Sequence, residues 1–204
     1  MRAVIISGGS MTDYGYLRSF IGADDYIVAA DSGYRHALAL GVSPHVLVGD
    51  FDSLDELPEG VQTYRFPTEK DMTDTELAVD FARGLGYRDF LFLGAIGSRM
   101  DHTLSNILLL TALLERGETG ALIDAHNQIY LTDREISIPA LPGVLCSLVP
   151  LTVCEGVTTD NLAYPLAHAT LHVGRGLGVS NVVLEGPVTV SLSVGKLLVL
   201  LCRD

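Results

Sequence analysis

Short apolar runs alternate with helical patterns of apolar residues over the first 124 residues of the chain. The apolar runs, typical of buried strands, occupy residues 3–7, 26–30, 46–48, 61–66, 90–93 and 121–124. Helical spacing of apolar residues is found between them at 34–40, 74–85 and 102–115. A glycine follows each of these three patterns as a C-terminal stop, at Gly41, Gly86 and Gly117. This alternation predicts an α/β fold in which helices flank a parallel sheet.

The pattern changes after about residue 126, where the apolar runs become shorter and richer in β-branched residues. Prolines and glycines interrupt these runs, for example at Pro150 and at the pair Gly186 and Pro187. Strand alternation is clearest over 188–194, and Gly195 then turns the chain into another apolar run. We therefore predict two domains, an α/β domain at residues 1–126 and an all-β sandwich or barrel at residues 127–204.

The composition indicates a soluble globular protein, because 48% of its 204 residues are apolar and can form a sizeable core. The formal net charge of -12 opposes binding to nucleic acid or to anionic lipid, since both favour clustered lysine and arginine. An acidic protein is nevertheless compatible with a phosphate substrate that arrives complexed with a divalent cation. We expect neither nucleic acid nor a membrane as a partner.

Cysteine usage and the N-terminus predict a cytoplasmic protein. Cys146, Cys154 and Cys202 are odd in number and form no CxxC pair, which disfavours both disulfides and a zinc site. The N-terminal residues lack the long apolar region and cleavage site of a signal peptide, and no apolar run approaches membrane-spanning length. A reducing compartment fits these observations best.

Aspartates follow several of the predicted strands, at the edge where open parallel sheets bind their ligands. They are Asp31, Asp50, Asp52, Asp71, Asp74 and Asp101, with Arg99 close to the last of them. An extended backbone would direct Asp50 and Asp52 to one side and Phe51 to the other, which suits a hard cation such as Mg²⁺. A solvated acidic turn explains the same spacing without a metal, and the pair alone does not decide between these interpretations.

Helix capping competes with a site role for some of these acids. Thr73 and Glu76 have the spacing of a capping box, so we assign Glu76 to the start of the helix. Asp71 and Asp74 remain site candidates. Asp101 is either a site residue or only the N-cap of the helix that begins near His102.

Basic residues and glycines near the acidic loops are candidates for phosphate contacts. Lys70 and Arg99 are the basic residues closest to these loops, and they can offset charge on polyphosphate oxygens. Residues 7–10 and 94–98 carry glycines between a strand and a helix, where backbone amides can approach phosphate. Neither segment matches the Walker A motif or the full dinucleotide fingerprint, which disfavours P-loop kinases and NAD enzymes.

Two pairs of polar residues remain open between functional and structural roles. His102 and Asn106 share one face of a predicted helix, where Asn106 can reach either a ligand or a neighbouring loop. His168 and His172 lie on one face of a strand-like segment, but without a third ligand we favour surface histidines over a metal pair.

In order and spacing, these segments resemble the thiamine pyrophosphokinase family. The matching positions are 30–33, Pro44, 49–53, 70–74 and 97–102, followed by 147–150, 157–166 and 180–181. The resemblance implies a Rossmann-like α/β domain that binds ATP and Mg²⁺, followed by a β-sandwich domain that binds thiamine. It also implies a homodimer whose active sites are shared between the α/β domain of one subunit and the β domain of the other.

The resemblance assigns a role to each candidate residue in the transfer of a diphosphoryl group from ATP to thiamine. It makes Asp50, Asp52 and Asp74 the acids that handle Mg²⁺ and the diphosphate. The supporting or nucleophile-orienting acids are Asp31, Asp71 and Asp101. The ATP-binding residues are Gly8, Gly9, Asp31, Ser32, Lys70, Arg99 and His102. The positions that match the thiamine pocket are Tyr164, Ser180 and Asn181.

The chain departs from the family pattern at several positions. Ser98 and Asn161 stand where the family commonly has glycine, and Val182 stands where an acid is frequent. Tyr164 occupies a position where the family often places a tryptophan that stacks on thiamine, and this chain contains no tryptophan. The change at Tyr164 concerns the acceptor substrate and leaves the phosphate chemistry untouched.

Two other functions explain part of the pattern. A metal-dependent nucleotide-sugar transferase would use Asp50 and Asp52, but it leaves 70–74 and 99–102 unexplained. A nucleotide- or thiamine-binding module without catalysis is favoured only by the altered residues of the thiamine pocket.

Overall fold

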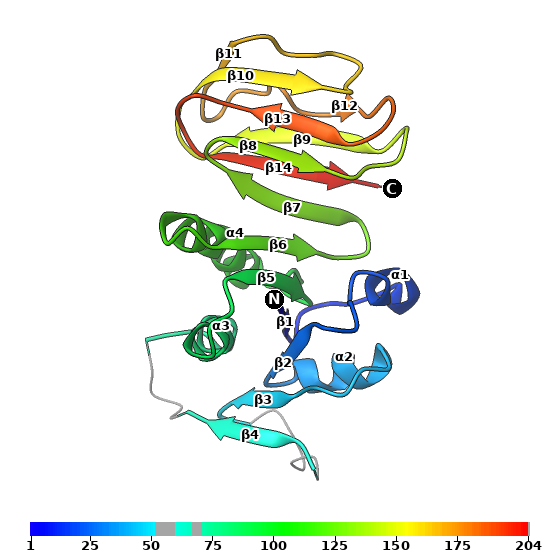
Figure 1. Ribbon diagram of the computed structural model, residues 1–204, viewed down its shortest axis with the longest axis vertical. Coiled ribbons are helices and arrows are strands. Elements are labelled where there is room, and N and C mark those ends of the chain that lie inside the picture. The colour runs from blue at the N-terminus through cyan, green and yellow to red at the C-terminus, as the bar shows by residue number, and fades with distance from the viewer. Residues whose placement is uncertain (52–59, 67–70, 204) are drawn as a thin grey trace. The chain divides into compact units, whose positions relative to one another are not determined.

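The computed structural model describes residues 1–51, 60–66 and 71–203, which form two compact units, Met1–Ala125 and His126–Asp204. Helices and parallel strands make up the first unit, and the second is built from strands (Figure 1). Within the described ranges, no helix is both long and apolar enough to cross a membrane.

The first unit is a parallel sheet with helices on both faces. Its strands pair in the order β6-β5-β1-β2-β3-β4. They are β1 (Arg2–Ile6), β2 (Tyr26–Ala30), β3 (Val46–Gly49), β4 (Gln62–Arg65), β5 (Asp89–Leu93) and β6 (Thr119–Ile123). The helices are α1 (Tyr14–Arg18), α2 (Gly33–Ala39), α3 (Asp74–Gly84) and α4 (Met100–Glu115). Figure 1 shows α1 and α2 on one face of the sheet and α3 and α4 on the other, so the central strands are mostly apolar, whereas the edge strand β4 is exposed.

Alternate residues of the central strands pack against the two helical layers. Val4 and Ile6 of β1 belong to a buried cluster that also contains Leu17 of α1 and Ala37 of α2. All four of these side chains are fully buried. The predicted α/β fold is therefore confirmed, and burial on both faces explains the uninterrupted apolar runs.

The ends of the helices follow local sequence signals. Gly41, Gly86 and Gly117 lie directly after helix C-caps, with φ of 68°, 97° and 70°, as expected for glycine stops. At the start of α3, the Thr73 hydroxyl accepts a hydrogen bond from the Glu76 amide at 3.2 Å. The Glu76 carboxylate accepts one from the Thr73 amide at 2.8 Å. The predicted capping box is confirmed.

The second unit consists of two antiparallel sheets that share one core. One sheet has the order β9-β14-β7 with β12 beside β9, and the other has the order β11-β10-β13-β8. The strands are β7 (Asn127–Thr132), β8 (Glu135–Ile138), β9 (Leu145–Pro150), β10 (Cys154–Asp160), β11 (Ala169–Leu171), β12 (Asn181–Val182), β13 (Val188–Ser191) and β14 (Leu197–Cys202). Leu148 and Val199 of the first sheet belong to the same buried cluster as Val157 and Val190 of the second. The predicted all-β sandwich is confirmed.

The three cysteines are free thiols. Burial raises the pKa of the Cys146 thiol to about 12, and the nearby Cys202 adds to this effect. Cys146 therefore stays protonated and unreactive at neutral pH.

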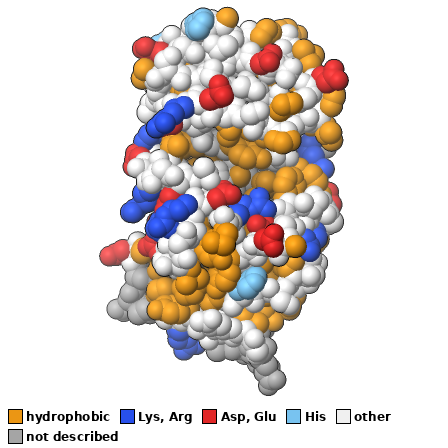
Figure 2. Space-filling model, in the orientation of Figure 1, with side chains coloured by type: hydrophobic (Ala, Val, Ile, Leu, Met, Phe, Trp, Pro, Cys, Tyr) orange, Lys and Arg blue, Asp and Glu red, His pale blue; other side chains and the backbone are white. Residues whose placement is uncertain are grey.

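Basic and acidic side chains are interspersed on the face of the molecule that Figure 2 shows. This arrangement differs from the clustered lysines and arginines that bind nucleic acid.

A buried ion pair joins α3 to the turn before β6. Glu118 is 3% exposed, and Arg83 donates to its two carboxylate oxygens at 2.9 and 3.1 Å through Nε. We expect Glu118→Gln to lower the free energy of unfolding by about 2 kcal/mol, because Arg83 loses its buried charged partner and keeps the half-exposed Asp80. Urea denaturation measures this change.

Asp133→Asn is the matched control, because the side chains of the Asp133–Arg134 pair are 42% and 89% exposed. We expect it to change the stability by less than about 0.5 kcal/mol. Equal effects of the two substitutions would contradict the structural role of Glu118.

Candidate active site

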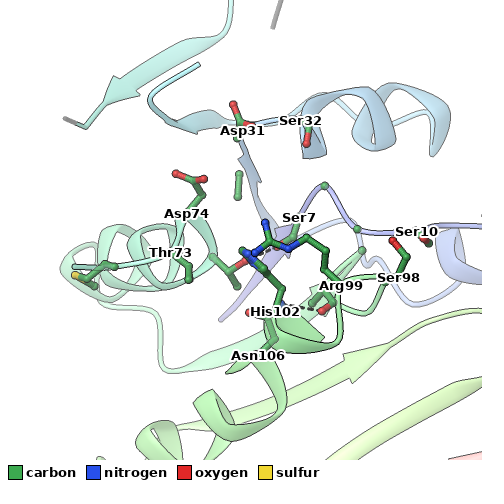
Figure 3. Close-up of a pocket in the computed structure, with 18 residues that line it drawn as sticks. Ser7, Ser10, Asp31, Ser32, Thr73, Asp74, Ser98, Arg99, His102 and Asn106 are labelled. Atoms are coloured by element: carbon green, nitrogen blue, oxygen red, sulfur yellow. Dashed lines mark hydrogen bonds between the residues drawn. The ribbon is translucent and has the colours of Figure 1, made fainter. Parts of the chain in front are cut away.

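A cavity of about 460 Å³ lies at the carboxyl ends of β1, β2 and β5 (Figure 3). Open parallel sheets bind ligands at this edge. The loops that line the cavity follow these strands and are completed by the start of α3 and the first turns of α4. They contribute Ser7, Gly8, Gly9, Ser10, Asp31, Ser32, Thr73, Asp74, Thr75, Gly97, Ser98, Arg99, His102 and Asn106, among others.

The floor of the cavity is formed by loops whose backbones are in close contact. A Cβ on Gly9 would lie 2.4 Å from the Gly94 carbonyl oxygen. A Cβ on Gly94 would lie 2.3 Å from the Ser7 carbonyl oxygen, and Gly94 has a φ of 65° that also favours glycine. The glycine segments singled out in the sequence are therefore required by packing as well as being suited to approach by a phosphate.

Hydrogen bonds from α3 and α4 hold these loops in place. The hydroxyls of Ser7 and Thr75 lie 2.9 Å apart in a buried contact between the loop after β1 and α3. Asn106, which is 7% exposed, donates its side-chain amide to the Ala95 carbonyl at 2.7 Å. Asn106 thus forms a hydrogen bond with a neighbouring loop, which is one of the two roles considered for it. It also lines the cavity.

Two of the predicted acids line the cavity. Asp31 follows β2 in a left-handed conformation, with a φ of 46°, and Asp74 is the first residue of α3. Figure 3 shows both carboxylates at one end of the cavity, while Ser10 and Ser98 lie at the other end and the Arg99 side chain extends between them. The site therefore has carboxylate oxygens, which can bind a metal ion, at one end. The Arg99 guanidinium and the serine hydroxyls, which can donate hydrogen bonds, lie along the rest of the cavity.

The loop after β3 differs from its predicted conformation. Phe51 has a left-handed φ of 67°, and its side chain is 5% exposed and packs with Ala29 and Leu47. The expected extended backbone is therefore wrong at Phe51, because the ring turns into the core. Asp50 is half-buried before this turn, and Asp52 lies outside the described residues, as does Lys70.

Among the described residues, Asp50, Asp71 and Asp101 do not line the cavity. Asp71 is exposed just before the Thr73 cap. In the part of the chain that the structure describes, no three His, Cys, Asp or Glu side chains are grouped closely enough to hold a metal ion by themselves. Mg²⁺ needs only one or two protein carboxylates, because substrate phosphates and water complete its coordination.

Asp101 pairs with Arg99 at the start of α4. The helix begins at Met100 with Arg99 at the N-cap position, so the N-cap role considered for Asp101 is wrong. Arg99 donates to both Asp101 oxygens, at 2.6 and 3.3 Å. This hydrogen bonding lowers the pKa of Asp101 to about 2, so its carboxylate is ionised and weakly basic at neutral pH. Its geometry suits it to orient the Arg99 guanidinium.

The residues matched to the thiamine pocket lie in the second unit. Tyr164 is 74% exposed, and its backbone is held by the buried side chain of Asn181. The Asn181 amide accepts from the Tyr164 N–H at 3.0 Å and donates to the Tyr164 carbonyl at 2.7 Å. The Ser180 N–H donates to the Ser147 hydroxyl at 3.0 Å. Asn181 thus supports the loop that presents Tyr164.

A left-handed backbone explains one departure from the family pattern. Asn161 has a φ of 62°, a conformation that asparagine tolerates better than most residues other than glycine. His168 also has a positive φ, of 51°, and lies just before β11. The strand-like spacing considered for His168 and His172 therefore does not apply.

Sequence reasoning assigned no role of their own to several residues that line the cavity. Ser7 and Ser10 flank two glycines that were singled out, so their position was the available signal. The sequence gives no signal that Thr75 belongs to the site, because a threonine in the first turn of α3 is explained by helix capping. Its role depends on the contact with Ser7, which is distant in sequence.

Comparisons with known proteins agree over nearly the whole chain. Residues 17–120 match the family described as thiamin pyrophosphokinase, catalytic domain, and residues 132–197 match thiamin pyrophosphokinase, vitamin B1 binding domain. A thiamine pyrophosphokinase from Bacillus subtilis (strain 168) is 27% identical, with 98% of both chains covered.

Solved structures show the same similarity. The crystal structure of thiamine pyrophosphokinase from Bacillus subtilis has a TM-score of 0.89 and 26% identity, with 100% of both chains covered. That of thiamin pyrophosphokinase from Geobacillus thermodenitrificans has a TM-score of 0.84 and 27% identity, with 100% of this chain and 98% of the other covered.

Proposed function

The chain belongs to the thiamin pyrophosphokinase family of diphosphotransferases, and we propose that it transfers the diphosphoryl group of ATP to the hydroxyl of thiamine in a Mg²⁺-dependent reaction. The observation that carries this proposal is the cavity at the carboxyl edge of the sheet. It combines the carboxylates of Asp31 and Asp74 with the Arg99 guanidinium and a floor of glycine-rich loops. These are the groups that a metal-complexed polyphosphate requires.

The donor set of the cavity fits Mg²⁺. Carboxylate oxygens are its preferred protein ligands, and Asp31 and Asp74 offer them from two different loops. We propose that Asp74 holds the ion with Asp50 and Asp52, and that Asp31 supports this group. An ion held there would offset the negative charge that develops on the phosphates during transfer.

In the proposed reaction, the thiamine hydroxyl oxygen forms a bond to the β-phosphorus of ATP. The bond between that phosphorus and the α–β bridging oxygen breaks, and AMP leaves with this oxygen. The hydroxyl proton passes to a carboxylate of the cavity. Arg99 binds phosphate oxygens and Asp101 orients it, while Asp101 itself is too weak a base to take the proton. Positioning and charge stabilisation by fixed groups are the main demands of such a transfer.

The acceptor part of the proposal concerns the second unit. We propose that Tyr164 offers its exposed aromatic face to thiamine, with Asn181 and Ser180 shaping the loop around it. Tyrosine has a smaller face than tryptophan and a polar tip. A homodimer with shared active sites stays a prediction from the resemblance, and a cytoplasmic location stays a prediction from the cysteines and the N-terminal residues.

One assay separates this function from its alternatives. The purified protein is incubated with Mg²⁺, ATP and thiamine, and we expect AMP and thiamine diphosphate in equal amounts. Production of ADP and thiamine monophosphate would indicate transfer of a single phosphoryl group. Binding of ATP or thiamine without any product would favour a binding module, and turnover of a nucleotide sugar alone would favour the transferase.

Metal removal gives a further prediction. We expect excess EDTA to reduce AMP formation to background, because without a cation the cavity carboxylates repel the phosphates of ATP. Added Mg²⁺ should restore the rate. Full activity in EDTA would contradict the assignment of the acids to a metal.

A further inference from the structure

His36 of α2 contacts the loop that follows β1, which contains Gly8 and Gly9 and lines the cavity. Its Nε2 lies 2.8 Å from the Gly9 carbonyl oxygen, and its Nδ1 lies 2.8 Å from the Tyr14 hydroxyl. A carbonyl only accepts hydrogen bonds, so Nε2 carries a proton and donates it to this bond. In the neutral ring, Nδ1 then accepts from the Tyr14 hydroxyl. Two hydrogen bonds therefore connect α1, through α2, to the loop after β1.

The fold holds this imidazole firmly. Gly33 and His36 are three residues apart and share one face of α2. That face lies so close to β1 that a Cβ on Gly33 would be 1.9 Å from the Ile6 carbonyl oxygen. Ala37 is fully buried beside them. The helix backbone thus fixes the distance between His36 and the loop.

The contact with His36 determines how one peptide group of the loop is oriented. The Gly9 N–H donates to the Gly94 carbonyl at 2.7 Å, while the Gly9 carbonyl is bound by His36. Because a trans peptide is planar, the N–H of Ser10 points away from the Gly9 carbonyl and hence away from His36. Ser10 lines the cavity, and its nitrogen would lie 3.1 Å from a Cβ on Gly97 in the opposite glycine loop.

We propose that His36 is a positioning residue of this site, which presents the Ser10 amide to an anionic oxygen of the nucleotide. The inference rests on the proposed function in taking ATP as the ligand. Backbone amides that are fixed in advance bind phosphate oxygens without the entropy loss of ordering a loop. Without the bond from His36, the peptide between Gly9 and Ser10 can rotate and this advantage is lost.

The test compares His36→Phe, which keeps a ring but has no donor, with His36→Gln, whose side-chain amide can replace the Nε2 donor. We expect His36→Phe to raise the KM for ATP about tenfold, the effect of one hydrogen bond, and to leave the KM for thiamine unchanged. His36→Gln should recover most of the affinity for ATP. A purely structural role would instead lower the thermal midpoint and change both KM values together.

His45→Phe is the matched control. His45 is also hydrogen-bonded to the backbone, but as an acceptor from the Ile27 N–H at 3.0 Å, and it precedes β3 and so lies at the opposite edge of the sheet. It should leave the KM for ATP unchanged. An NMR titration with ATP gives a direct readout, because the Ser10 amide signal should shift in the wild-type protein and much less in His36→Phe.

The outcomes distinguish this inference from the proposed function. If the wild-type protein neither binds ATP nor forms AMP, the proposed function fails. If the wild-type protein is active and His36→Phe keeps its KM for ATP within about twofold and the Ser10 shift unchanged, the role of His36 is overturned while the function stands.

Discussion

Replacing Asp74 with asparagine is expected to lower kcat by about a thousandfold, which corresponds to the several kcal/mol that metal-assisted charge stabilisation contributes. Asp74 lines the cavity from the first turn of α3, where its carboxylate faces the space that the phosphates would occupy. Asparagine keeps the size of the side chain and its helix-compatible geometry, so the protein should fold normally. The measurement is kcat at saturating ATP and thiamine, with the urea midpoint recorded alongside.

Glu76→Gln is the matched control for this substitution, because it also removes one negative charge from the first turn of α3. Glutamine still accepts the hydrogen bond from the Thr73 amide, so the capping box is retained. We expect its kcat to stay within about twofold of the wild-type value. A kcat for Asp74→Asn within the same range would remove Asp74 from the metal site.

Gly33→Ala is expected to lower the free energy of unfolding by about 3 kcal/mol, the upper part of the range for overpacking a core. The added methyl group would lie 1.9 Å from the Ile6 carbonyl oxygen, 2.7 Å from its carbon and 3.0 Å from the Ser7 carbonyl carbon. These are backbone atoms of β1 and the following loop, so they cannot move aside as a side chain can. The cavity floor should distort together with the loss of stability, which raises the KM for ATP as well.

The control is Gly84→Ala at the end of α3, where a Cβ would meet no atom within 4 Å. This substitution should be neutral or stabilise the protein by up to about 1 kcal/mol, since alanine favours the helix. Urea denaturation of both variants measures the difference. Similar stabilities for the two alanine variants would show that α2 can move away from β1.

Most strands and helices could be predicted because their signals are local or periodic. Burial on both faces makes β1 and β5 continuous apolar runs, and glycine at positive φ ends α2, α3 and α4. The short helix α1 was not predicted, because five residues are too few to establish a helical period. Phe51 was misjudged for a different reason: its left-handed turn follows from tertiary packing against Ala29 and Leu47.

The site could be predicted only as far as topology alone determines it. Parallel strands end at one edge, and this rule was enough to bring Asp31, Asp74 and Arg99 to one cavity. This rule could not predict that Asp74 lines the cavity and Asp71 does not. The two differ in position relative to the Thr73 cap, since Asp71 precedes it and Asp74 begins α3. The rule also missed His36, whose contact with Gly9 depends on how closely α2 packs on β1.

The close contact of the glycine loops limits how this enzyme can be redesigned. Because main-chain atoms form the cavity floor at Gly9 and Gly94, neither position has a side chain that could be exchanged to favour another nucleotide. A protein engineer must instead work on lining residues that have side chains, such as Ser98 in the loop before α4 and His102 in its first turn. A change of donor preference must therefore come from the side chains around the glycine loops.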